Sequence, residues 1–298
     1  GSKSPNYRQF NIDDYKADIA VDRDGNIYVQ DYGNYQIQKY DSNGKFLIKW
    51  GGKGSINGNF NGLGGIAVDL DNNIYAVDGN KRIQKFTCKG KFITKWKITD
   101  FTGIKVNRNK DVYGYSWHDM VKYDSKGNII THWPVPPSNP DMTPQGSICE
   151  IAINSKNNIF VLHINLSPEV LAMHWSPDYK SEDTFYAVNT LLKYSANGGL
   201  LKEYELYDEK KKRLYNCHSI TIDSKDNIFI SGGSTHHCIW KFDSEYNLIT
   251  KFGSEGSGNG QFKSPCSIAV DLKGNVYVMD NVNCCIQKFA PVIKSQKL

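Results

Sequence analysis

The chain of 298 residues is 39% hydrophobic and 22% charged, with a formal net charge of +5. This length allows one or two domains with substantial cores. No run of eighteen apolar residues occurs, which excludes a membrane-spanning helix, and the mild positive charge lacks the strongly basic footprint of a dedicated nucleic-acid-binding domain. Gly1-Ser2 resemble a cloning scar, so an upstream domain or signal peptide stays open.

The first sequence unit is predicted to form four short antiparallel strands. Apolar and polar residues alternate over 19–21, 27–29, 36–40 and 45–50, which is the two-residue period of a strand. The intervening segments 22–26 and 41–44 are rich in Asp, Asn and Gly, and Asn and Gly tolerate the positive φ that tight hairpin turns need. Four such strands make one blade of a propeller.

This unit recurs down the whole chain at a period of about 40–50 residues, which is typical of repeat architectures. Each copy has an apolar strand that ends in Asp or Asn, then a polar turn and a second apolar strand; the marks are Asp22, Asp69, Asn107, Asn154, Asp223 and Asp271. The sequence therefore predicts one all-β domain over 1–298, a six-bladed β-propeller of four-stranded antiparallel blades. The blades are expected near 17–52, 64–97, 102–134, 149–205, 218–253 and 266–298, and the last blade gains its fourth strand only with residues 292–297.

Long connections are predicted on one face of this ring, because they all join second to third strands or link one blade to the next. The largest is an insertion over 164–190, and long loops in compact domains are usually functional or disordered. Its aromatic content argues against disorder. We expect its side chains to contact a partner, the candidates being His174, Trp175, Tyr179, Phe185 and Tyr186.

A basic run follows on the same face and is the candidate contact for phosphate groups. It comprises Lys210, Lys211, Lys212 and Arg213, and Lys81 and Arg82 are further candidates. The alternative for such a run is a solvated loop tip. A proline-rich stretch over 134–140 is expected to be a stiff crossing between the third and fourth blades.

The central channel is the other place where chemistry could occur. The register places Asp18, Gly65, Gly103, Glu150, Ser219 and Ser267 at its mouth, with Cys149, His218 and Cys266 one position earlier. Asp18, Glu150 and His218 are the candidate metal ligands there. The alternative, which we favour, is that these polar groups satisfy one another and channel water, with no metal or cofactor.

The repeated aspartates have a structural interpretation. Asp22, Asp69, Asp223 and Asp271 each begin a turn, where a carboxylate accepts hydrogen bonds from exposed amides. We expect Asp31, Asp78 and Asp280 to cap the opposite corner with Asn34, Asn80 and Asn283.

The seven cysteines show no metal-type spacing. Their odd number and scattered positions favour reduced thiols and therefore an intracellular setting. The adjacent pair Cys284-Cys285 is expected to hold one buried and one exposed side chain rather than a strained vicinal disulfide. One glycosylation sequon, 165–167, keeps a secreted alternative open.

The sixth unit carries the most complete motif. It reads Ser-Ile-Ala-Val-Asp at 267–271, Gly-Asn-Val-Tyr-Val at 274–278, Asp280, Asn283 and Ile-Gln-Lys-Phe at 286–289, after a glycine-rich stretch at 256–262. This pattern resembles the NHL-repeat family over nearly the whole chain. The resemblance implies a six-bladed propeller, and it implies several uses: RNA-binding and protein-binding modules of ubiquitin-ligase proteins, extracellular sensor domains, and amidating lyases with a channel metal. The lyases would place several histidines in the channel, whereas the register places only His218 there.

These observations favour a non-catalytic, monomeric binding module that recognises a protein through its loop-rich face. Single-stranded RNA binding on the same face is the second hypothesis. A metal-dependent lyase or hydrolase that uses the channel is the third.

Overall fold

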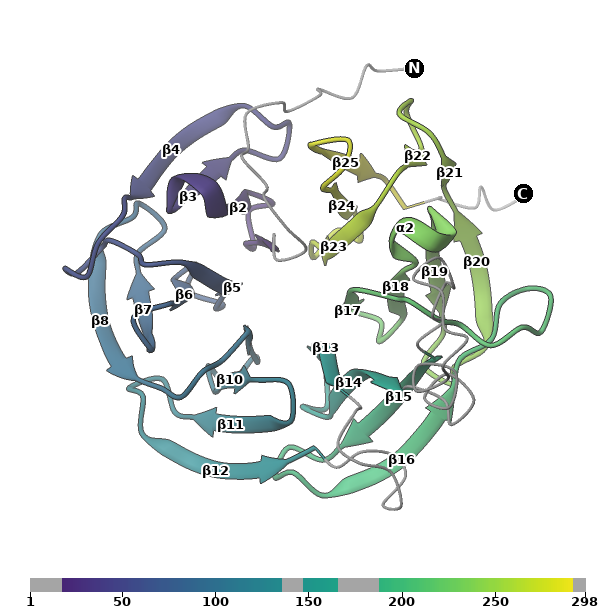
Figure 1. Ribbon diagram of the computed structural model, residues 1–298, viewed down its shortest axis with the longest axis horizontal. Helices are drawn as coiled ribbons and strands as arrows, with labels where there is room; N and C mark the ends of the chain where they lie inside the picture. The colour runs from purple at the N-terminus through teal and green to yellow at the C-terminus, as the bar shows by residue number, and fades with distance from the viewer. Residues whose placement is uncertain (1–17, 136–146, 166–187, 292–298) are drawn as a thin grey trace, which may run out of the picture.

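The computed structural model describes residues 18–135, 147–165 and 188–291, and these form a closed ring of six antiparallel sheets around a central channel (Figure 1). Each sheet is one blade, and its strands run in chain order from the channel to the rim, as predicted. Blade 1 holds β1 (Ile19–Val21), β2 (Ile27–Asp31), β3 (Gln36–Tyr40) and β4 (Phe46–Gly51). Blade 2 holds β5 (Leu63–Val68), β6 (Ile74–Asp78), β7 (Arg82–Phe86) and β8 (Phe92–Lys97). Blade 3 holds β9 (Gly103–Val106), β10 (Val112–Tyr115), β11 (Asp119–Tyr123) and β12 (Ile129–Pro134).

The second half of the ring repeats this order. Blade 4 holds β13 (Ser147–Ile153), β14 (Ile159–Asn165), β15 (Val188–Tyr194) and β16 (Leu200–Glu205). Blade 5 holds β17 (Ile220–Ile222), β18 (Ile228–Ser231), β19 (Ile239–Phe242) and β20 (Leu248–Phe252). Blade 6 holds β23 (Pro265–Val270), β24 (Val276–Asp280) and β25 (Cys285–Phe289). The fourth strand predicted over 292–297 lies outside the described residues.

Short elements complete the connections. These are the 3-10 turn η1 (Tyr32–Asn34), the helical turn α2 (Gly233–His236), and a parallel pair between blades 5 and 6, β21 (Ser254–Glu255) with β22 (Gln261–Phe262). The insertion is shorter than the predicted 164–190, because β14 and β15 stay paired as far as Asn165 opposite Val188.

The repeated aspartates cap the first turn of the blades, which confirms their predicted structural role. The Asp22 carboxylate accepts hydrogen bonds from the main-chain amides of Asp24 and Asn26 at 3.0 and 2.8 Å, and from the Tyr28 hydroxyl at 3.0 Å. Asp271 makes the same set of contacts with Lys273, Asn275 and Tyr277. At the opposite corner Asp31, Asp78 and Asp280 accept from the side chains of Asn34, Asn80 and Asn283, also as predicted.

Tryptophans of the outer strands join neighbouring blades. Trp50, Trp96 and Trp133 each cover a turn glycine of the next blade, and a Cβ on that glycine would lie 2.5–2.8 Å from the indole. Gly90, Gly127 and Gly198 are these glycines, and all three have a positive φ. Glycine is therefore required twice over, by conformation and by contact.

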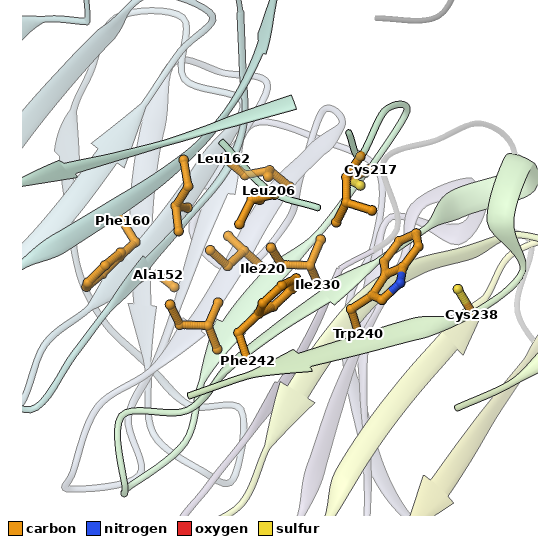
Figure 2. Close-up of a cluster of buried hydrophobic side chains, with 13 residues drawn as sticks. Ala152, Phe160, Leu162, Leu206, Cys217, Ile220, Ile230, Cys238, Trp240 and Phe242 are labelled. Atoms are coloured by element: carbon orange, nitrogen blue, oxygen red, sulfur yellow. The ribbon is translucent and has the colours of Figure 1, made fainter. Parts of the chain in front are cut away.

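The core between blades 4 and 5 includes side chains from the connection that links them. Figure 2 shows Leu206 and Cys217 of this connection among Ile220, Ile230 and Trp240 of blade 5. Burial of Leu206 and Leu214 at the two ends of the loop therefore anchors the basic run between them.

Candidate binding surface at the channel mouth

One mouth of the channel is a cavity of about 230 Å³. Blades 2, 3, 4 and 6 line it with strand residues, and blades 1 and 5 line it with residues that precede their first strands. Asp18 precedes β1, Glu150 lies in β13 and Ser267 lies in β23, while His218 precedes β17 of blade 5. Tyr115 and Trp117 come from the corner between β10 and β11. Ile164 near the end of β14 also lines the cavity.

The polar residues predicted at the mouth tie neighbouring blades together. Each accepts a hydrogen bond from a main-chain amide in the first strand of the next blade. The bonds are Ile66 to Asp18 Oδ2 at 3.0 Å, Ile220 to Glu150 Oε2 at 3.0 Å, Ile268 to Ser219 Oγ at 3.1 Å, and Ile19 to Ser267 Oγ at 3.3 Å. Gly65 and Gly103 occupy the equivalent position in blades 2 and 3, and they have no side chain that could accept such a hydrogen bond. The ring of contacts is therefore interrupted on both sides of blade 3.

A buried ion pair lies beside this gap. The Lys105 ammonium of β9 contacts Glu150 Oε1, and both side chains are largely buried. Burial would lower the pKa of Lys105, but the charges of Asp18 and Glu150 outweigh it and raise that pKa. Burial raises the pKa of Glu150, assisted by Asp18 and opposed by Lys105. Because the strong ammonium contact favours the ionised carboxylate, we treat the pair as charged.

Tyr115 fills the space that Gly103 leaves. A Cβ at Gly103 would lie 2.1 Å from both Cζ and Oη of Tyr115, so only glycine lets the ring lie over this strand. The Tyr115 side chain is 4% exposed and lines the cavity, and its hydroxyl has no hydrogen-bond partner among the described residues. Burial, together with the charges of Glu150 and Asp18, raises its pKa, so the hydroxyl keeps its proton at neutral pH.

Trp117 is the residue that sequence reasoning missed. It is 55% exposed and lines both the channel mouth and a second hollow of about 320 Å³ between blades 2 and 3. Tyr32 and Phe101 also line this second hollow. The sequence did carry a signal for this residue. In the first two blades Asp and Asn cap the corner after the second strand, whereas the third blade lacks these caps and has a tryptophan at 117 instead.

The predicted basic residues do not form one surface. Lys81 is exposed and pairs with Asp100 at 3.0 Å, but Arg82 is only 7% exposed. The Arg82 guanidinium donates to Asp78 and to the carbonyls of Ser55, Ile56 and Asn59, so it fixes the connection between blades 1 and 2.

The basic loop lies at the opposite side of the ring. The connection from β16 to β17, which carries Lys210, Lys211, Lys212 and Arg213, protrudes at the right-hand rim of Figure 1, while the corner with Lys81 lies at the left. Arg213 pairs with Glu205 at 3.1 Å, and Glu209 next to the run pairs with Lys251 at 2.6 Å. Acidic neighbours therefore offset much of this charge. The candidates His174, Trp175, Tyr179, Phe185 and Tyr186 lie outside the described residues.

The mouth does not fit a metal site. Asp18, Glu150 and His218 line the same cavity, but within residues 18–135, 147–165 and 188–291 no three His, Cys, Asp or Glu side chains converge as ligands would. The carboxylate oxygens already accept bonds from amides, Ser267 and Lys105. Burial lowers the pKa of His218, which packs against Gly233. No disulfide joins any of the seven cysteines, all of which lie in the described residues, and Cys285 is buried while Cys284 is partly exposed.

No protein-family model and no curated protein matches the chain. Among solved structures it is similar to a streptogramin B lyase, at 15% identity and a TM-score of 0.57 over 91% of this chain and 77% of that one. It is also similar to the WD40 β-propeller domain of Doa1, at 10% identity and 0.60 over 97% and 96%. Virginiamycin B lyase from Staphylococcus aureus gives 14% and 0.53 over 96% and 88%. At such identities these likenesses establish the propeller fold alone. In the described part of the chain no helix is long and apolar enough to cross a bilayer.

Proposed function

We propose that this protein is an NHL-type, non-catalytic binding module that recognises a protein partner through the face around the channel mouth. The observation that carries the proposal is the exposed Trp117 indole at the junction of two adjoining hollows. Tryptophan is enriched among the residues that dominate protein interfaces, and it acts best beside pockets that exclude water.

The small volume of the channel mouth favours a protein ligand. Sites for small molecules usually enclose about 300–1,000 Å³, and the channel mouth, at about 230 Å³, is smaller. A protruding side chain fits such a volume, while the second hollow can receive the neighbouring part of the same partner. The insertion with Trp175, Tyr179 and Phe185 belongs to the proposed surface because Ile164, directly before it, lines the mouth.

Two observations favour protein over RNA as the ligand. The basic candidates lie on opposite sides of the ring, and Arg82 holds a loop in place instead of facing solvent. The candidate metal ligands argue against a channel enzyme, because the carboxylates at the mouth already accept hydrogen bonds that hold neighbouring blades together.

The test is capture of partners from native extract on the immobilised protein, with and without nuclease, beside Trp117→Ala. The control is Leu272→Ala, which removes an exposed apolar side chain from a first turn on the opposite face. We expect a bound protein that survives nuclease, is lost with Trp117→Ala and remains with Leu272→Ala. Binding that needs nucleic acid and weakens steeply with salt would establish the RNA alternative instead.

A further inference from the structure

We infer that the channel mouth receives a lysine side chain of the protein partner, with its ammonium group between Tyr115, Asp18 and Glu150. This inference rests on the proposed function and names the chemistry by which that same surface recognises its partner.

The charges at the mouth favour a cation. Asp18 and Glu150 contribute two negative charges and Lys105 one positive charge, which leaves a net charge of −1 among these groups. His218, whose pKa burial lowers, is neutral at pH 7 and does not balance this charge. An incompletely compensated negative charge in a site of low dielectric is costly, and an entering cation relieves that cost.

The hydrogen-bonding capacity that remains also fits an ammonium group. A carboxylate can accept about four hydrogen bonds. Asp18 accepts three, from Ile19, Ile66 and the Ser267 hydroxyl, while Glu150 accepts from Ile220 and Lys105. Both carboxylates therefore keep at least one acceptor site.

Tyr115 provides an observation that does not depend on the acidic residues. The residue lines the cavity and is 4% exposed, and its hydroxyl lacks a partner among the described residues. A ligand N–H would supply that partner. The Trp117 indole, exposed on the same cavity, offers an aromatic face to a cation that enters.

Lysine fits better than arginine. A guanidinium group binds most strongly to two free oxygens on one edge of a carboxylate. Here both oxygens of Asp18 and both of Glu150 already accept bonds. An ammonium group is a compact charge and needs only single acceptors at separate points, which is what the cavity retains.

The probe for this inference is n-butylammonium chloride, which reproduces the end of a lysine side chain. The whole protein is labelled with 5-fluorotryptophan, and ¹⁹F NMR follows its six tryptophans, with the Trp117 signal assigned from its loss in Trp117→Phe. We expect a saturable shift of the Trp117 signal alone, and no comparable shift with n-butanol. Equal shifts with n-butanol or n-butylguanidinium, or no shift at all, would overturn the assignment to lysine.

The decisive variant is Tyr115→Phe, which removes only the hydroxyl and keeps the ring over Gly103. We expect n-butylammonium to bind about tenfold more weakly, the usual loss for one hydrogen bond to a charged group. Tyr207→Phe, an exposed tyrosine at the rim, should bind as the unchanged protein does. Unshifted signals from the other five tryptophans verify the fold of each variant. If Tyr115→Phe leaves the affinity unchanged while partner capture still needs Trp117, the lysine inference fails and the proposed function stands.

Discussion

Replacing Asp69 by alanine should destabilise the protein far more than the same change at Asp243, although both residues cap a turn in the same way. Asp69 Oδ1 accepts from the amides of Asp71 and Asn73 at 2.9 and 2.8 Å, and Asp243 Oδ1 accepts from Glu245 and Asn247 at the same two distances. The two variants therefore lose equivalent turn contacts. The two aspartates differ in the groups that surround the second carboxylate oxygen, Oδ2.

The second oxygen of Asp69 serves a buried network. Asp69 Oδ2 accepts from the hydroxyl of the fully buried Tyr75 at 3.0 Å, and the Lys85 ammonium lies 3.4 Å away. Leaving a buried hydroxyl unpaired costs about 1–3 kcal/mol, and removing one partner of a buried ion pair costs about 3–5 kcal/mol. Since these contributions overlap and Lys85 retains some exposure, we expect Asp69→Ala to lower the free energy of unfolding by about 4 kcal/mol.

Urea denaturation, followed by tryptophan fluorescence and far-UV circular dichroism, measures this difference. The transition midpoint should fall much further for Asp69→Ala than for Asp243→Ala. Adding Tyr75→Phe to Asp69→Ala should recover part of the loss, because it removes the hydroxyl that has lost its acceptor. Equal midpoints for the two alanine variants would show that the turn contacts alone matter and that the buried network contributes nothing.

Arg82→Met should lower the free energy of unfolding by about 3 kcal/mol in the same urea assay, because it leaves the buried Asp78 carboxylate without a counter-ion, while Lys81→Met should have little effect because its ion pair is exposed. Gly103→Ala should lower the thermal midpoint, because the added Cβ would collide with Tyr115; an unchanged melt would show that the ring moves freely. Burial would raise the pKa of Asp69, but its contacts with Asn73, Lys85 and Tyr75 outweigh burial and lower it. Its stabilisation should therefore be complete above the pKa of an unfolded aspartate, about 3.9, and be lost as the pH falls further, so acid titrations of Asp69→Asn should show a shallower loss there.

The architecture could be predicted because its signals are local. Asp22, Asn26 and Tyr28 lie within seven residues of one another, and their mutual hydrogen bonds depend only on the turn that joins two adjacent strands. Six such units require six blades, and the register of Ile19, Ile66 and Ile268 places the preceding residues at the channel. The same locality explains why Arg82 was predicted at the surface beside Lys81. Lys81 lies in the turn before β7 with a positive φ and its side chain is exposed, whereas Arg82 begins β7 and its guanidinium lies under a loop 23–27 positions away.

The repeat, the turns, the strand order and the set of polar residues that approach the channel could all be read from the amino-acid sequence, because each rests on contacts between residues close in the chain. The contacts that those polar residues make depend on how distant parts of the chain meet in the folded ring. Asp18 meets Ile66, and Glu150 meets Lys105, across separations of 48 and 45 residues. Tyr115 lies over Gly103 of its own blade, and Trp117 lines both hollows. Such contacts depend on how the blades stack and close, which is set by burial across the whole ring and not by the residues of one blade.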